Sequence, residues 1–144
     1  MHNHSIYEQL EKRILVIDGA MGTMLQNENL SPDDFGGEEL DGCNENLVLT
    51  RPDVIQKVHE AYFEAGADIV CTNTFGSTPL VLNEYDLGHK ADEINAAAVG
   101  LAIAARDKYT SAEWPRYVAG AMGPTTKTLS VTGGITFEEI QKNF

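Results

Sequence analysis

The chain has 144 residues, which is enough for one domain with a hydrophobic core. Its 10 Lys and Arg residues and 22 Asp and Glu residues give a net charge of −12, which argues against nucleic acid as a partner. The polar segment before Arg13 lacks the apolar run of a targeting signal, and no stretch reaches the roughly 20 apolar residues of a membrane span. The two cysteines, Cys43 and Cys71, do not make a disulfide framework, so the sequence predicts a protein of the reducing cytoplasm with no membrane as a partner.

Three short apolar runs predict strands at 14–18, 67–75 and 117–123. None of them alternates polar with apolar residues, which is typical of strands that are buried on both faces of a parallel sheet. The segment 26–48 shows little periodicity, so we expect a long loop that is either functional or packed over the rest of the domain.

Helical patterns lie between these runs, and the clearest covers 50–66. Thr50 is expected to cap this helix with Asp53 as its capping-box partner, Pro52 fits the first turn, and Gly66 ends the helix. Further helices are predicted from Pro79, over 91–109, and from a Thr136 cap with Glu139 as its partner. Strands that alternate with helices predict βαβ units, so the expected fold class is α/β with a parallel sheet.

Polar residues and glycines follow each predicted strand: Asp18, Gly19 and Ala20 after the first, and Thr72, Asn73 and Thr74 in the second. In parallel α/β sheets the ligand site lies at the carboxyl edge of the strands, so these residues are the candidate binding site. Two alternatives stay open. Asp18 is equally suited to cap a helix that begins near Met21, and the Thr72–Thr74 side chains could simply hydrogen-bond neighbouring loops.

The sequence shows no metal-ligand spacing, because Cys43 and Cys71 stand far apart and neither has a second cysteine nearby. His2 and His4 lie at the terminus, and His59 is interpreted as a residue of the helix surface or the core. Cys71, inside a strand, is interpreted as a small buried hydrophobe. No catalytic residue is assigned.

Five segments carry a resemblance to a known family: ILVIDGAMGTMLQ, NLVLTRPDVIQKVHEAYFEAGADIVCTNTFGST, INAAAVGLA, YVAGAMGPT and GGITFEEI. In this order they resemble the homocysteine S-methyltransferase family, over nearly all of the chain from Arg13 onward. The DGAMGTM run, the DDFGGEEL loop and the GGITFEE ending favour its branch of cobalamin-dependent methionine synthases.

The resemblance implies a TIM (β/α)8 barrel, of which residues 13–144 would form the first three βα units, with residues 1–12 as an N-terminal extension. It implies that a zinc-bound homocysteine thiolate takes the methyl group of methylcobalamin, and that folate- and cobalamin-binding modules are partners in a longer protein. By the same resemblance Asp18 would hold the substrate ammonium, and the Gly19–Ala20 turn would lie against its carboxylate. Thr72, Asn73 and Thr74 would line the pocket floor.

The chain departs from the family pattern in one respect: the family's three zinc-binding cysteines belong to later strands, and neither Cys43 nor Cys71 stands in their NC or GGCC contexts. Three readings therefore stay open. The chain is part of a methionine synthase, part of a cobalamin-independent homocysteine methyltransferase or its fusion with a methylenetetrahydrofolate reductase, or a non-catalytic partial barrel.

Overall fold

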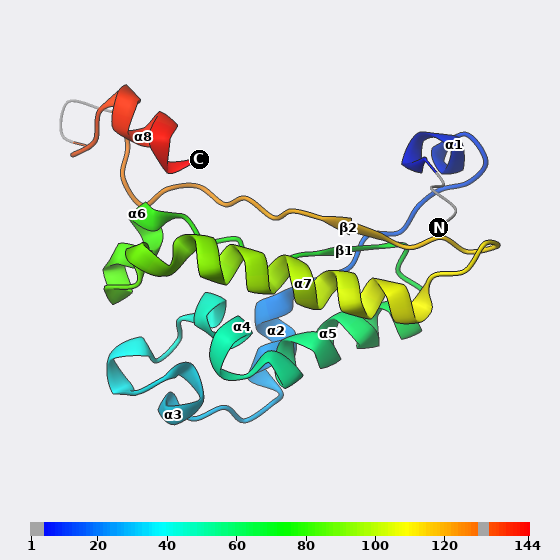
Figure 1. Ribbon diagram of the computed structural model, residues 1–144, viewed down its shortest axis with the longest axis horizontal. Helices are drawn as coiled ribbons and strands as arrows, with labels where there is room; N and C mark the ends of the chain where they lie inside the picture. The colour runs from blue at the N-terminus through cyan, green and yellow to red at the C-terminus, as the bar shows by residue number, and fades with distance from the viewer. Residues whose placement is uncertain (1–4, 130–132) are drawn as a thin grey trace.

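The computed structural model describes residues 5–129 and 133–144, so the predictions for His2 and His4 lie outside the described residues. Two short parallel strands cross one side of a layer of helices (Figure 1). The helices are α1 (Ile6–Leu10), α2 (Met21–Gln26), α3 (Pro32–Phe35), α4 (Leu47–Thr50), α5 (Pro52–Glu64), α6 (Pro79–Leu82), α7 (Ala91–Tyr109) and α8 (Phe137–Asn143). The strands are β1 (Ile69–Cys71) and β2 (Tyr117–Ala119), and short 3-10 turns lie at Glu38–Leu40, Asn44–Asn46, Asn83–Tyr85 and Gly88–Lys90.

The sheet is parallel, as predicted, with Ile69 opposite Tyr117 and Cys71 opposite Ala119. The predicted first strand, 14–18, is reduced to one parallel bridge between Ile17 and Ile69. This bridge lies on the other side of β1 from β2, so β1 is central. The three predicted strand segments therefore lie side by side in the order 14–18, β1, β2.

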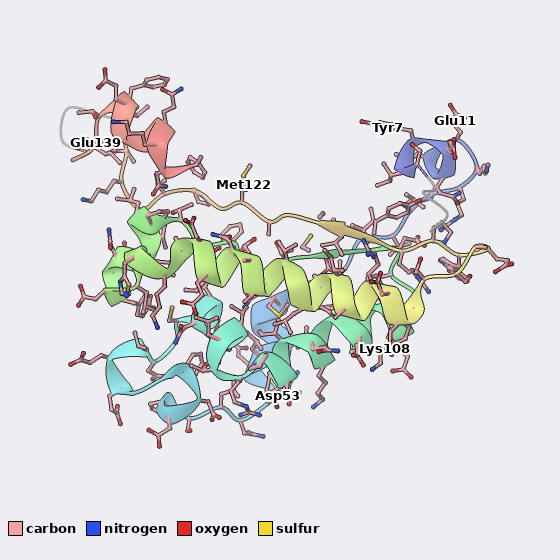
Figure 2. The ribbon with its side chains drawn as sticks, in the orientation of Figure 1. Tyr7, Glu11, Asp53, Lys108, Met122 and Glu139 are labelled. Atoms are coloured by element: carbon pink, nitrogen blue, oxygen red, sulfur yellow. The ribbon has the colours of Figure 1, made fainter. Side chains whose placement is uncertain are left out.

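Burial on both faces, which the apolar runs predicted, is wrong for this sheet. Helices α5 and α7 pack against β1 and β2 from one side, below the strands in Figure 1. The exposed fraction is 88% for Ile14 and 78% for Met122, and Figure 2 shows Met122 pointing away from α7. A strand is buried on both faces only where a layer covers each face, and among the described residues α5 and α7 supply one such layer.

The core lies mainly between α5 and α7, which form the most extensive helix pair. Val58 of α5 and Ile94 and Ala98 of α7 are fully or almost fully buried there. Both helices therefore contribute buried side chains to the same core. The small alanines of α7 allow the two helix backbones to approach closely, which is how this alanine-rich helix packs without large side chains.

The predicted cap of α5 is wrong. Thr50 is the last residue of α4, and its hydroxyl donates a hydrogen bond to the carbonyl of Asn46 at 3.2 Å. Helix α5 begins at Pro52, as the first-turn proline indicated, and the Arg51 guanidinium, rather than Thr50, binds the Asp53 carboxylate. At the other end Gly66 has a φ of 106°, the left-handed conformation expected of the residue that stops a helix.

The segment 26–48, predicted as a loop, contains α3 and two 3-10 turns and runs into α4. Its side chains Phe35, Cys43 and Leu47 are buried in the same core as α5. The expectation that this segment packs over the domain is confirmed. Its local structure was not predicted, because each of its elements is a single turn and is too short to show a periodic pattern of apolar residues.

Helices α6, α7 and α8 begin where the sequence predicts. Thr78 caps α6 through its side chain, and α8 begins at a complete capping box between Thr136 and Glu139. Within the part of the chain that the structure describes, no helix combines the length and apolar character needed to cross a membrane.

Candidate functional site

Asp18 lies where the first parallel segment ends, and its side chain continues the hydrogen-bond ladder of the sheet. The main-chain N–H of Asp18 donates to the carbonyl of Ile69 at 2.9 Å. The Cys71 N–H then donates to the carboxylate Oδ2 of Asp18, also at 2.9 Å. Helix α2 begins at Met21 with Ala20 in the capping position and without a side-chain cap. The capping role considered for Asp18 is therefore wrong, and its carboxylate is fixed by β1 instead.

Burial is the largest influence on this carboxyl group and raises the pKa of Asp18 above its usual value. Hydrogen bonds from the main chain and thiol of Cys71 favour the ionised form and oppose part of that rise. Among the described residues no cation forms an ion pair with Asp18. The half-buried carboxylate is therefore held in place by neutral donors. Its negative charge is not neutralised by these donors and can pair with a cationic group of a ligand.

Cys71 is only partly buried, so its interpretation as a buried hydrophobe is wrong. Burial, followed by the negative charge of Asp18, raises the pKa of the Cys71 thiol to about 11. At neutral pH the free thiol therefore stays protonated, in a state that is not nucleophilic.

The Gly19–Ala20 turn is held by a residue that the sequence reading did not identify as part of the site. The hydroxyl of Tyr62, on α5, donates to the carbonyl of Ala20 at 3.1 Å. A Cβ atom at Gly19 would lie 3.0 Å from the same hydroxyl oxygen, so a larger residue would have to displace the ring. The turn is exposed and keeps its shape through this contact, 42 residues away in the chain.

Thr72, Asn73 and Thr74 are buried directly after β1. The hydroxyl of Thr74 donates to the Ala121 carbonyl at 2.7 Å, so the 2.7 Å contact between the two threonine hydroxyls has Thr72 as the donor. Thr72 in turn accepts from the Ala121 N–H at 3.1 Å, and Asn73 donates to the carbonyl of Asn44 at 2.8 Å. The hydrogen bonds to neighbouring loops that the sequence left as an alternative are therefore present, and they use the hydrogens of both threonines.

The described residues do not fit a metal site, since no group of three His, Cys, Asp or Glu side chains comes together among them. Burial raises the pKa of the Cys43 thiol, which lies in the core. His59 is fully buried, and burial lowers its pKa to about 4. Neither imidazole nitrogen has a hydrogen-bond partner among the residues that the structure describes. His59 therefore behaves as a neutral core residue, one of the two positions considered for it.

A second polar cluster lies at the amino end of β1, around the buried carboxylate of Asp68. Its Oδ1 accepts from the Trp114 indole N–H at 2.7 Å and forms an ion pair with Arg13 at 2.8 Å, and its Oδ2 accepts from the Val16 N–H at 2.8 Å. The Arg116 guanidinium stacks 4.6 Å from the Trp114 ring centre and lies 3.8 Å from the same carboxylate. The sequence analysis did not identify this cluster, because its members come from three separate segments.

One cavity, of about 370 Å³, lies beside the candidate site. It is lined by Leu25, Leu30 and Phe35 together with the polar residues Asn29 and Asn44. Asn44 also accepts the hydrogen bond from Asn73, so this hollow adjoins the loop that follows β1.

A family model described as homocysteine S-methyltransferase matches residues 15–144. The chain belongs to the homocysteine S-methyltransferase family. Among curated relatives, the methionine synthase of Mycobacterium leprae (strain TN) is 46% identical over 126 residues, which is 88% of this chain and 10% of that protein. The chain thus spans about a tenth of the length of this family member.

The fold also matches solved structures of the family. The oxidized form of the homocysteine methyltransferase MmuM from Escherichia coli superposes with a TM-score of 0.70 at 28% identity, over 85% of this chain and 41% of MmuM. Its metallated form gives 0.67 at 26% identity, over 81% and 40%. The mixed α/β architecture with a small parallel sheet is therefore that of part of the homocysteine methyltransferase fold.

Proposed function

We propose that the chain forms the substrate-holding part of a methionine synthase-type enzyme and binds homocysteine at the carboxyl edge of its parallel strands. The observation that carries the proposal is the Asp18 carboxylate, fixed by the Cys71 N–H at 2.9 Å and without an ion-pair partner among the described residues. Homocysteine offers an α-ammonium group, and a half-buried carboxylate with no cation of its own is a suitable partner for it.

The other candidate residues take supporting roles. The Gly19–Ala20 turn, shaped by the Tyr62 hydroxyl, lies against the substrate carboxylate. The Thr72 hydroxyl donates its hydrogen to Thr74, and the Thr74 hydroxyl donates its hydrogen to the Ala121 carbonyl. Their role is to hold the pocket floor rigid, and recognition of the substrate falls to Asp18.

Thiol activation needs groups other than those described. Zinc bound to a thiol supplies a thiolate at neutral pH. The described residues offer no ligand set for it, and the raised pKa values of Cys43 and Cys71 keep both thiols protonated. We therefore propose that the zinc ligands lie outside the described residues. The 46% identity to a methionine synthase favours methylcobalamin as the methyl donor over the cobalamin-independent alternatives. The free cysteines are consistent with a reducing, cytoplasmic setting.

We also propose that residues 13–144 supply the first three βα units of a TIM barrel, with α1 in the extension at residues 1–12. Two observations support this: the chain covers 41% of MmuM, and the outer strand face exposes Ile14 and Met122. Three strands leave two sheet edges unpaired, and exposed apolar surfaces associate. Expressed alone, the chain should form oligomers in size-exclusion chromatography with light scattering, whereas a monodisperse monomer with a sharp unfolding transition would contradict the partial barrel.

The function is tested with the full-length protein that carries this chain. Homocysteine should bind in isothermal titration calorimetry, and methionine should form when methylcobalamin is added. Formation of methionine at the same rate from another methyl donor, with no cobalamin present, would favour the cobalamin-independent alternative. Absence of homocysteine binding by a folded, zinc-loaded protein would overturn the proposal.

A further inference from the structure

Hydrogen bonds hold the loop Thr72–Gly76, which follows β1, on two sides. On one side it meets 121–123, where Thr74 donates to the Ala121 carbonyl and the Gly123 N–H donates to the Phe75 carbonyl at 2.9 Å. A Cβ atom at Gly123 would lie only 2.4 Å from that carbonyl oxygen, so the two segments are in direct backbone contact. On this side the loop therefore contacts the segment that follows β2.

The opposite side is held by two consecutive residues of the 3-10 turn Asn44–Asn46. The Asn44 carbonyl accepts from the Asn73 side chain at 2.8 Å, and the Glu45 Oε1 accepts from the Gly76 main-chain N–H at 2.8 Å. A Cβ atom at Gly76 would lie 2.7 Å from Glu45 Oε1, so the carboxylate lies flush against the loop backbone. The turn therefore contacts the loop at both of its ends.

The turn is itself anchored in the core. Cys43, before the two contacts, is almost fully buried, and Asn46, after them, donates from its side chain to the Phe35 carbonyl at 2.7 Å. A buried hydrogen bond of this kind is costly to break, so the turn is a fixed support. Movement of the loop relative to the core would have to break the contact made by Glu45.

We propose that Glu45 is a positioning residue for homocysteine binding: its carboxylate fixes the loop Thr72–Gly76 against the core and so sets the position of the pocket floor. This inference rests on the proposed function. The contact needs an acceptor at the end of a side chain of this length, but it does not need the charge. Glu45→Gln should therefore preserve it, while Glu45→Ala removes it and Glu45→Asp shortens the side chain by one methylene.

The test measures the dissociation constant of homocysteine and the melting temperature for these variants in the full-length protein. Glu45→Ala and Glu45→Asp should each weaken binding about tenfold, because a hydrogen bond to a charged acceptor is lost. Glu45→Gln should bind within about twofold of the wild type. Glu39→Ala, an exposed acidic residue of the same segment, is the matched control and should change neither quantity.

Three results would overturn the positioning role: unchanged affinity in both Glu45→Ala and Glu45→Asp, equal losses in Glu45→Gln and Glu45→Ala, or a lower melting temperature with unchanged affinity. Since Glu45→Asp keeps the charge and most of the side chain, it decides the question if Glu45→Ala does not fold. Failure of the proposed function would look different, because the wild type would then not bind homocysteine at all.

Discussion

Asp18 and Asp68 lie at opposite ends of the same short strand, and their surroundings differ sharply. Asp68, at the amino end of β1, accepts from Val16, Trp114 and Arg13. Asp18, at the carboxyl end, accepts from Cys71 alone among the other described residues. Burial pushes the pKa of both carboxyl groups upward, but at Asp68 the hydrogen bonds and the charge of Arg13 outweigh it, so the pKa of Asp68 is lowered while that of Asp18 is raised.

The difference separates a structural carboxylate from one available to a ligand. The partners of Asp68 come from the chain itself, and they tie the first segment, β1 and the start of β2 together. The charge of Asp18 is not neutralised by the described residues. A half-buried carboxylate without a cationic partner lowers the stability of the fold, but it can bind a cationic group of a ligand.

The largest effect should follow from removal of the structural carboxylate. Asp68→Ala leaves Arg13 without its carboxylate partner and removes the negative charge 3.8 Å from the 9%-exposed side chain of Arg116, which should cost about 3–5 kcal/mol in the free energy of unfolding. Urea unfolding measures this. Asp107→Ala, which removes the exposed partner of Arg106, is the control and should cost less than about 1 kcal/mol. A similar small loss in both variants would remove the contrast between the two ends of the strand.

Acid should destabilise the core in a defined pH window through His59. The buried imidazole has a folded pKa of about 4, below its ordinary value of 6.5, so between these values the unfolded chain binds more protons than the folded one. Stability from this group is therefore complete above pH 6.5 and falls as pH drops toward 4, by about 3 kcal/mol in all. The carboxylate of Asp68, with its lowered pKa, adds a loss that begins only near and below its ordinary value of 3.8.

Unfolding measured from pH 7 to 4 in the wild type and in His59→Leu checks this assignment. The leucine variant has no titrating group at this position and should show a much flatter profile over that range. An unchanged profile in His59→Leu would mean that groups other than His59 determine the response to acid between pH 7 and 4.

A smaller loss is expected from one donor to Asp68. Trp114→Phe keeps an aromatic ring beside Arg116 but removes the indole N–H that donates to Asp68 at 2.7 Å. The free energy of unfolding should fall by about 2 kcal/mol, the usual contribution of a hydrogen bond to a charged group. Homocysteine affinity should not change, since Trp114 lies at the amino end of the sheet. A selective loss of affinity in this variant would show that the two ends are coupled.

Local signals in the sequence predicted the elements of this fold well. Pro52 and Gly66 mark the ends of α5, the Thr136 and Glu139 capping box starts α8, and the order of the segments predicts the parallel pairing of β1 with β2. The helix ends depend on neighbours within a few residues, and the strand pairing follows from the order of the elements along the chain. The prediction that Thr50 caps α5 was wrong because α4 ends directly before α5. A good capping residue therefore lies at the end of one helix rather than at the start of the next.

The contacts that shape the candidate site join residues far apart in the chain, and periodicity carries no information about them. Tyr62 reaches Ala20 across 42 residues, and Glu45 reaches Gly76 across 31. The strand tips could be predicted because a parallel sheet places them at one edge. Their supports could not, because α5 and the turn at Asn44–Asn46 approach that edge only in the folded chain.

The contact between Asp18 and the substrate ammonium is tested most directly by two ligands and two proteins. The ligands are homocysteine and 4-mercaptobutanoate, which is the same molecule without its amino group. The proteins are the full-length wild type and Asp18→Asn, whose amide oxygen can still accept from Cys71. Calorimetry gives the four dissociation constants.

We expect the wild type to prefer homocysteine by about 2 kcal/mol or more, roughly thirtyfold, and Asp18→Asn to lose that preference with little change in its free energy of unfolding. An Asp18→Asn variant that keeps the wild-type preference but unfolds several kcal/mol more easily would contradict the account. It would make Asp18, like Asp68, a purely structural residue.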